Sequence, residues 1–503
     1  MLDALVIGSG PNGLVAAATL ARAGLRVQVC EAQDRVGGAL GSLPLTLPGF
    51  VHDVGAGFFP FGSISPGLVQ LDLPGAGLQW AFAPIDSAHV DAAGHCGVIA
   101  RDLERTVAEL GRDGEAWRRV AEWNQHLGSR LVEALIAPLP PVREGLALGV
   151  ENGLKFAAIA LRTAAEWSER TFATPGARQM IPGLALHADL GPDDFTSSAV
   201  GMMLALLAAK TGFGVPVGGA EQITRALRAR LEEAGGSVRT GARVKNVIVR
   251  DHRAVAVRLA DGEELAARSI VADTSPVTLA LELVGAAHLP HRLVSSMKRF
   301  AYGWGTFKLD WALSGPVPWT APACREAAVV HLGEGIGGMR TFTSEVREGK
   351  LPVQPYALIG QQSLMDATRA PAGQHALYGY THVPSELAGG WVGAREAFAD
   401  RVEGWIEACA PGFRQRILAR HILAPPDLFA MNENLVGGDL GGGTAHIERQ
   451  LVFRPAFPYF RYRFGLKGLY LASASTHPGT GVHGACGYNA ARAVLQDLGA
   501  RGR

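Results

Sequence analysis

A glycine-rich turn near the start of the chain constrains the fold more than any other feature. Residues 4–7, ALVI, form a short apolar run typical of a buried strand, and an alanine-rich helical stretch follows Gly13 and ends at Gly24. Gly8 allows a tight turn, Gly10 lets the backbone approach a pyrophosphate, and Gly13 lets helix and strand pack closely. The stretch therefore predicts a βαβ dinucleotide-binding fold. The predicted cofactor contacts in this turn are Gly8, Ser9, Gly10, Pro11, Asn12 and Gly13.

An acidic residue completes this pattern. The second expected strand, RVQVCE, ends in Glu31, which lies 18 positions after Gly13. A carboxylate at this place accepts hydrogen bonds from ribose hydroxyls and repels a 2′-phosphate, so it disfavours NADP. The expected helix also presents free N–H groups and a partial positive charge to the pyrophosphate. The alternative is a glycine-rich turn that binds nothing, but strand, helix, second strand and acid together favour a nucleotide site.

The residues after Glu31 point to the kind of dinucleotide. Arg35 and the doublet Gly37-Gly38 allow a second close backbone approach to phosphates, as the longer path of a flavin dinucleotide requires, and GFVHDVGAGFF follows at residues 49–59. The run R-x-G-G followed by H-D-x-G resembles the FAD-containing phytoene desaturase and amine oxidase superfamily. Ala39 stands where amine oxidases usually carry arginine. The resemblance implies further FAD contacts at Ala32, Ala39, Gly57, Phe58 and the backbone of Val244, whose segment has a plain β-hairpin extension as its alternative.

A second Gly-x-Gly-x-x-Gly motif occurs at residues 479–484, within THPGTGVHGACGYNAARAVL. An independent nucleotide domain would need a further strand and acid after the helix that follows, and we expect none in the few residues beyond it. The positive end of that helix would instead stabilise negative charge near N1 and the C2 carbonyl of a reduced flavin. We expect the N–H groups of Thr480, Gly481 and Val482 to face one FAD around which both ends of the chain meet. The loop resembles the C-terminal flavin motif of phytoene-desaturase-like proteins.

The middle of the chain contains segments that differ in their expected secondary structure. We predict an FAD-binding domain from residues 1–89, 214–279 and 441–503, and a substrate-binding domain from residues 90–213 and 280–440. The predicted fold class is α/β: a Rossmann-type FAD-binding domain, like that of glutathione reductase and amine oxidases, with a discontinuous α+β substrate domain. Five large side chains are candidates either for the core or for the substrate pocket: Met202, Met203, Trp304, Trp311 and Tyr380.

Composition excludes several classes of function. A net charge of +1 gives no reason to expect a nucleic-acid partner. The five cysteines are widely spread and form no C-x-x-C pair, which excludes a disulfide-reductase mechanism and favours a reducing cytoplasm. No apolar run approaches the ~18 residues of a membrane span, and we expect no signal peptide because the first strand starts near residue 4. We expect a cytoplasmic protein with at most a peripheral membrane contact and leave its oligomeric state open.

The resemblance implies an FAD-dependent oxidoreductase. In such proteins the flavin takes a hydride from an apolar small molecule and a C=C bond forms, while some relatives isomerise or saturate such bonds. His477, His483 and Arg454 lie in or near the C-terminal motif and are candidates for catalytic contacts, with structural hydrogen bonding as the alternative. Without a second nucleotide fold, we expect dioxygen, a quinone or another acceptor to reoxidise the flavin. Two further readings stay open: C–N oxidation of the amine-oxidase type, and an interaction protein with FAD as a structural core.

Overall fold

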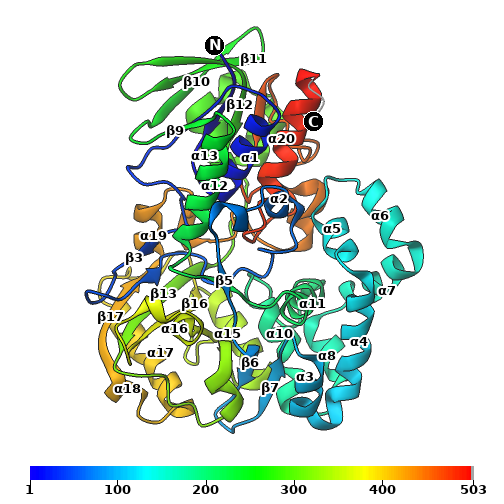
Figure 1. Cartoon of the computed structure of the whole chain (residues 1–503), viewed down its shortest axis with the longest axis vertical. Helices are drawn as coiled ribbons and strands as arrows, with labels where there is room; N and C mark the ends of the chain where they lie inside the picture. The colour runs from blue at the N-terminus through cyan, green and yellow to red at the C-terminus, as the bar shows by residue number, and fades with distance from the viewer. Residues whose placement is uncertain (500–503) are drawn as a thin grey trace.

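The computed structural model describes residues 1–499 and places two seven-stranded sheets one above the other in Figure 1. The upper sheet has the order β10-β11-β12-β1-β2-β9, and β18 pairs with β12 beside this path. Five adjacent strands are parallel to one another, in the order β9, β2, β1, β12 and β18. Strands β10 and β11 pair antiparallel, and β11 joins β12. The bounds are β1 Leu2–Ile7, β2 Val27–Cys30, β9 Ser237–Arg239, β10 Val244–Arg250, β11 Arg253–Leu259, β12 Glu264–Ala272 and β18 Leu469–Leu471.

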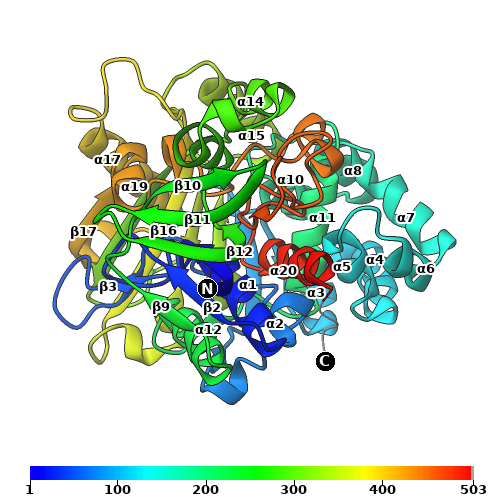
Figure 2. The same ribbon diagram turned by 90° about the horizontal axis from the view of Figure 1, so that it is seen from above.

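Both faces of the upper sheet are buried, because successive side chains of a strand point to opposite sides. Ala4 and Val6 pack with helices α1 (Pro11–Arg22), α12 (Glu221–Glu233) and α20 (Ala485–Leu498). Leu5 and Ile7 face a second core built on β10, β11 and β12. Helix α1 lies between α12 and α20 (Figures 1 and 2), so the first and last helices of the described chain touch.

The lower sheet has the order β17-β13-β16-β15-β14-β6-β7. Val329 faces a core with α10 (Met180–Ala185) and α11 (Ser197–Ala208), and its neighbour Val330 faces a core with α17 (Arg395–Cys409). Every residue of β13 is buried, as expected for a central strand covered on both sides. The bounds are β6 Ile85–Val90, β7 Cys96–Ile99, β13 Gly305–Leu313, β14 Ala327–Leu332, β15 Ala357–Gly360, β16 His375–Val383 and β17 Ile417–Leu423.

The remaining elements connect and flank the sheets. Helices α3 to α8 stack beside the lower sheet, on the right of Figure 1. Their bounds are α3 Leu103–Leu110, α4 Gly114–Leu127, α5 Arg130–Ile136, α6 Val142–Leu148, α7 Val150–Ala160 and α8 Ala164–Thr171. The other bounds are α2 Pro66–Val69, α9 Pro175–Arg178, α13 Pro276–Thr278, α14 His291–Met297, α15 Gly335–Arg347, α16 Gln362–Met365, α18 Phe413–Arg416, α19 Pro425–Met431, β3 Ser42–Leu43, β4 His52–Asp53, β5 Trp80–Ala81 and β8 Val215–Pro216.

This architecture confirms the predicted fold class, a Rossmann-type domain with an α+β partner assembled from separate segments. The exact domain borders stay a prediction. Strand β6 begins at Ile85 and pairs with β14 of the lower sheet, although residues up to 89 are assigned to the FAD-binding domain in that prediction. Within residues 1–499, no helix combines the length and apolarity needed to cross a membrane.

Candidate flavin and substrate site

The N-terminal glycine turn joins β1 to α1. The close packing leaves no room for side chains here: a Cβ atom on Gly13 would lie 2.3 Å from the carbonyl oxygen of Gly8. No side chain caps α1, and the main-chain N–H groups of Gly10 and Asn12 have no hydrogen-bond partner among residues 1–499. Free N–H groups at the positive end of a helix are the arrangement that binds a pyrophosphate. The turn therefore fits the phosphates of a dinucleotide.

The carboxylate of Glu31 is held against this turn. Its Oε2 accepts hydrogen bonds from the main-chain N–H of Ser9 at 2.9 Å and from the Ser9 hydroxyl at 2.5 Å, and its Oε1 accepts from the N–H of Gln33 at 2.9 Å. The N–H of Ala242 donates to the carbonyl of Glu31 at 2.7 Å, which brings the start of β10 beside Glu31 and Ala32. Val244, the first residue of β10, therefore lies near the predicted ribose site.

The second glycine pair packs on the first. The N–H of Gly37 donates to the Ser9 hydroxyl at 3.2 Å, and a Cβ atom on Gly38 would lie 3.3 Å from the Cα atom of Gly10. The N–H groups of Gly38 and Ala39 have no partner within the described part of the chain. These donors extend the row that begins at the N-terminal turn, so the predicted phosphate contacts lie side by side.

The passage from the phosphates to the lower sheet runs through residues 55–58. The hydroxyl of Tyr378, on β16, donates to the carbonyl of Gly55 at 2.7 Å. A Cβ atom on Gly57 would lie 3.3 Å from the Tyr378 ring, and half-buried Phe58 meets that ring edge-on with centroids 6.2 Å apart. The predicted FAD contacts Gly57 and Phe58 thus stand where the two sheets approach each other.

The C-terminal motif closes on the same place. A Cβ atom on Gly487 would lie 1.9 Å from the carbonyl oxygen of Asn12, so α20 crosses directly over the start of α1. The N–H groups of Thr480, Gly481 and Val482, in the loop just before α20, have no partner among residues 1–499. Two stretches of unpaired donors from the two ends of the chain therefore share one site, which suits a single dinucleotide rather than two.

One residue of this site escaped the sequence analysis. Asp273 follows β12, the parallel neighbour of β1, and its Oδ2 accepts a hydrogen bond from the N–H of Gly13 at 2.8 Å. Burial raises the pKa of this carboxyl to about 7, against the lowering effect of the Gly13 N–H, and the charge of Glu31 adds to the rise. Carboxyl ends of parallel strands meet at one edge of a sheet, so the run IVAD at residues 270–273 carried a usable signal.

The two candidate histidines are buried in the C-terminal loop. His483 accepts the N–H of Ala485 at Nδ1, 3.0 Å away, and so caps the first turn of α20, while the hydroxyl of Ser65 donates to its carbonyl at 2.5 Å. The carbonyl of His477 accepts from the hydroxyl of Tyr462 at 3.0 Å. Burial lowers the pKa of each imidazole to about 4, so both are neutral at neutral pH. A catalytic role for either histidine stays a prediction.

Arg454 is buried and directs all three of its nitrogens at main-chain carbonyls. Six hydrogen bonds of 2.7–3.3 Å reach the carbonyls of Gly441, Gly442, Gly443, Thr444 and Ala474. The guanidinium thereby joins residues 441–444 to the strand end that precedes the C-terminal motif. This geometry favours a structural role over the predicted contact with substrate.

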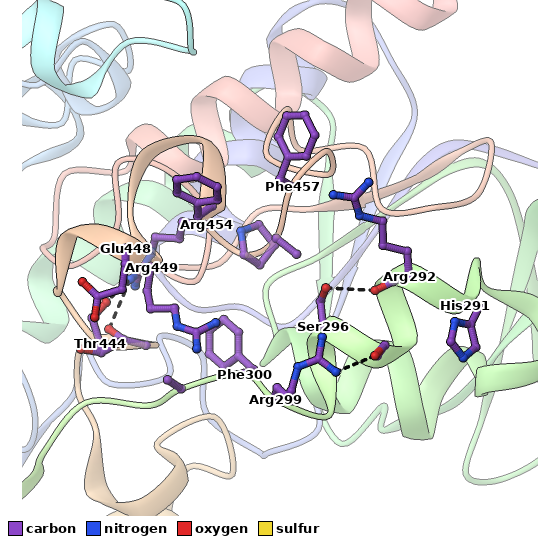
Figure 3. Close-up of a pocket in the computed structure, with 16 residues that line it drawn as sticks. His291, Arg292, Ser296, Arg299, Phe300, Thr444, Glu448, Arg449, Arg454 and Phe457 are labelled. Carbon is purple, nitrogen blue, oxygen red and sulfur yellow. Dashed lines mark hydrogen bonds between the residues drawn. The ribbon is translucent and has the colours of Figure 1, made fainter.

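Arg454 also lines a pocket of about 480 Å³. Figure 3 shows α14 on one side of the pocket, with Arg292 and Arg299, and the segment bearing Glu448, Arg449 and Arg454 on the other. The lining residues include none of the predicted FAD contacts. The pocket therefore does not coincide with the predicted cofactor contacts, although Arg454 also lies beside Gly479 of the C-terminal motif.

Five large side chains were candidates either for the core or for the substrate pocket, and two of them belong to the core. Met202 and Trp311 are fully buried, and the indole of Trp311 donates to Glu403 at 2.9 Å. Met203, Trp304 and Tyr380 are half-buried. The ring of Tyr380 lies 6.1 Å from that of Tyr378, which in turn meets Phe58. Trp304 packs on His382, the neighbour of Tyr380 on the other side, so both rings continue the aromatic series that begins at Phe58.

Comparison with known proteins identifies the family. The model for flavin containing amine oxidoreductase matches residues 108–359, half of the chain, and a model for an NAD(P)-binding Rossmann-like domain matches residues 6–71. The chain belongs to the flavin-containing amine oxidoreductase family. It is an FAD-dependent oxidoreductase, and the predicted cofactor is confirmed.

Individual relatives place the chain within this family. Pyridine nucleotide-disulfide oxidoreductase domain-containing protein 2 from Mus musculus is 28% identical over 99% of this chain and 94% of its own. All-trans-zeta-carotene desaturase from Myxococcus xanthus is 25% identical over 95% and 90%. The fold of an oxidoreductase from Methanosarcina mazei matches with a TM-score of 0.66 at 16% identity, over 98% and 99%. The predicted membership of a phytoene-desaturase-like family of FAD oxidoreductases is confirmed.

The geometry around Glu31 gives a first testable prediction. We expect Glu31→Arg to lose most of its FAD, because a cation replaces the acceptor that orients Ser9 and that is predicted to bind the ribose. The measurement is flavin absorbance per protein after purification. Glu109→Arg, the same charge reversal on exposed α3, should retain the cofactor. A fully yellow Glu31→Arg protein would show that this carboxylate does not bind the ribose.

Asp273 gives a prediction of pH dependence. Its raised pKa means that the carboxyl is protonated below about pH 7 and gains a negative charge above it. One added charge beside a bound pyrophosphate costs at least about 1.4 kcal/mol at a dielectric constant of about 20, so FAD affinity should fall at least tenfold between about pH 6 and pH 9. In Asp273→Asn, the affinity measured by fluorescence titration should be flat over this range. Equal pH dependence in both proteins would remove Asp273 from the cofactor site.

Proposed function

We propose that this oxidoreductase removes a hydride and a proton from a mainly apolar small molecule and forms a C=C bond. When bound, FAD supplies the two-electron oxidation. The observation that carries the proposal is the convergence of the two donor-rich glycine motifs with the half-buried rings of Phe58, Trp304 and Tyr380 at the junction of the two sheets. Unpaired N–H groups suit a cofactor there, and aromatic walls suit an apolar substrate.

The chain's own residues have distinct tasks in this proposal. The turn at residues 8–13, the pair Gly37-Gly38 and Glu31 hold the phosphates and ribose. The N–H groups of Thr480, Gly481 and Val482, next to the positive end of α20, stabilise negative charge on the flavin ring. The lower sheet orients the substrate and excludes water.

Support for C=C formation comes from the relative named all-trans-zeta-carotene desaturase, which matches nearly the whole chain. Isomerisation or saturation of a C=C bond would use the same aromatic side chains around the substrate. A second candidate is C–N oxidation, as the name of the matching family model suggests. It is favoured by polar groups next to the aromatic rings: His382 is buried, its Nε2 has no partner in the described chain, and its ring lies 5.7 Å from that of Tyr380.

The test is anaerobic bleaching of the flavin by a panel of compounds. The panel contains a partly saturated carotene, a cyclic monoterpene hydrocarbon, a diamine, a cyclic primary amine, NADH and NADPH. We expect a hydrocarbon to bleach the flavin, whereas bleaching by an amine alone would select C–N oxidation. Rapid bleaching by either nicotinamide nucleotide, or by no organic compound, would contradict the proposed function.

A further inference from the structure

A chain of five hydrogen-bonding side chains crosses the core of the substrate-binding region. The hydroxyl of Tyr380 and Nδ1 of His187 are 3.2 Å apart, and Nε2 of His187 and Nε2 of His331 are 2.8 Å apart. The hydroxyl of Ser87 lies 3.2 Å from Nδ1 of His331 and 3.0 Å from Nε2 of His89. We call this set the relay; its members, in order, are Tyr380, His187, His331, Ser87 and His89.

The fold places these residues in register. Ser87 and His89 lie on β6, and His89 is the direct partner of His331 on the parallel strand β14, so their rings stack with centroids 4.2 Å apart. Tyr380 lies on β16, and His187 follows α10. Sequence analysis missed the set because its members are far apart in the chain; Ser87 and His331 are separated by 244 positions.

The histidines of the relay are neutral at neutral pH. Burial lowers the pKa of His89 and of His187 to about 3, and it also lowers the pKa of His331. Among residues 1–499, no carboxylate or cation forms an ion pair or a hydrogen bond with a relay side chain. The titratable groups that face the relay are His382 and Tyr378, beside Tyr380, and Tyr356, beside His89 and His331.

Neutral members impose a direction on the relay. Each hydrogen bond holds one proton, and each imidazole carries one proton and one lone pair, so every member donates once and accepts once. If Tyr380 donates to His187, all the bonds run toward His89, whose Nδ1 then carries an unpaired proton. If the direction reverses, the hydroxyl of Tyr380 points outward as a free donor. The relay therefore has two neutral arrangements related by the shift of one proton per bond.

The two ends of the relay differ: the Tyr380 end is half-buried, and the His89 end is buried but lacks a hydrogen-bond partner. Tyr380 is half-buried, and its ring lies 6.1 Å from that of Tyr378, which binds the Gly55 carbonyl in the segment predicted to line the flavin. At the other end, neither Nδ1 of His89 nor the hydroxyl of Tyr356 has a partner in the described chain. Both atoms flank Gly183: a Cβ atom there would lie 2.8 Å from the first and 2.3 Å from the second.

Packing alone does not account for the relay. Buried polar groups lose hydration, and apolar residues of similar volume stabilise a core at least as well. The surrounding core is built from side chains such as Ile181, Val329 and Leu358, which shows that this region can be packed without polar groups. A continuous polar chain through it, with one end toward the predicted flavin contacts, is a path along which a proton can pass.

We propose that Tyr380 accepts the proton that leaves the substrate with the hydride, and that the other relay members pass a proton to the far side of His89. The inference rests on the proposed function, in which FAD is the oxidant. One C–H bond breaks with its electron pair passing to FAD. The second C–H or N–H bond gives its proton to the oxygen of Tyr380, and its electron pair forms the new double bond.

The proton balance closes along the relay. Tyr380 gives its own hydroxyl proton to Nδ1 of His187, and His187 gives its Nε2 proton to Nε2 of His331. His331 gives its Nδ1 proton to Ser87, Ser87 gives its proton to Nε2 of His89, and His89 releases its Nδ1 proton to water, which is the proton's final acceptor. One proton enters and one leaves, so every member ends neutral and the direction of the relay is reversed.

The first test needs no substrate. The FAD-loaded full chain is labelled with ¹⁵N-histidine, and its resonances are assigned with single His→Gln variants. If the relay acts as one unit, Tyr380→Phe will change the tautomer signals of His89 as well as those of His187. In the Ser87→Ala background, the same substitution should leave His89 unchanged. If Tyr380→Phe in the otherwise wild-type chain changes the tautomer signals of His187 alone, the proposal is overturned.

The second test uses the compound that bleaches the wild-type flavin fastest in the panel. Ser87 is separated from Tyr380 by two imidazoles, so Ser87→Ala should slow flavin reduction about 100-fold without changing KM. Ser198→Ala removes another buried hydroxyl of this region, one that donates to the carbonyls of Ile159 and Arg162, and should leave the rate unchanged. Reduction of Ser87→Ala at the wild-type rate would refute the relay while the proposed function stands. If no compound bleaches the wild type, the proposed function fails, and the histidine signals alone decide on the relay.

Discussion

Gly487→Ala should lose most of its bound FAD and unfold at a lower temperature than the wild type. The new methyl group would lie 1.9 Å from the carbonyl oxygen of Asn12, well inside van der Waals contact with the main chain, so α20 must move away from α1. Overpacking of this kind costs about 1–3 kcal/mol, and more where backbone has to shift. Because the C-terminal donors lie in the loop just before α20, displacement of this helix also opens the cofactor site. Flavin content and thermal unfolding measure the two effects.

Gly153→Ala is the matched control. Gly153 lies within α7, and a Cβ atom there would meet nothing within 4 Å. Alanine is favoured over glycine inside a helix by about 1 kcal/mol, so this variant should be as stable as the wild type or slightly more so, and fully yellow. If Gly487→Ala matched it in both respects, the close crossing of α1 and α20 would not be needed for cofactor binding.

Arg454→Met should be strongly destabilised, although it replaces a charged residue by an apolar one of similar length. The substitution leaves the carbonyls of Gly442, Gly443 and Ala474 without a donor among residues 1–499. The carbonyls of Gly441 and Thr444 keep the Thr480 hydroxyl and the Gln450 amide as donors. Each buried group left without a partner costs about 1–3 kcal/mol, so a loss of about 3 kcal/mol or more is expected. Chemical denaturation of the FAD-loaded chain measures it.

Arg454→Lys separates the structural role from a catalytic one. Lysine keeps the charge, but a single ammonium cannot reach all five carbonyls that the three guanidinium nitrogens bind. We expect intermediate stability and a loosened flavin. A contact with substrate would instead give a lysine variant of normal stability with slow turnover, and that result would restore the sequence-based assignment.

Local pattern explains which parts of the fold the sequence predicts well. The stretch at residues 4–32 carries its own strand, turn, helix and acid, and the structure places them as β1, α1, β2 and Glu31. The C-terminal glycine motif and the helix after it were recognisable in the same way, and the structure sets this helix against the start of α1. These inferences need only the spacing of residues within about 30 positions.

Contacts between distant segments explain what was missed. Asp273 reaches Gly13 across 260 positions, and the relay joins strands from three separate parts of the chain. The glycine run at 441–443 has no pattern of its own, because its order comes from other segments. Asp439 accepts the N–H groups of Gly441 and Gly443 at 2.6 and 2.7 Å, and Arg454 binds the carbonyls. Sheet order and these partners are set by tertiary packing, which spacing along the chain does not encode.

The crossing of α1 and α20 also fixes when during biosynthesis the cofactor can be captured. The phosphate-binding turn at residues 8–13 is synthesised more than 470 residues before Gly487. At synthesis rates of about 5–20 residues per second, the turn waits on the order of a minute for the helix that completes its site. Nascent chains are therefore expected to take up FAD only after α20 has been made, so ribosome-bound chains truncated before α20 should not retain the flavin.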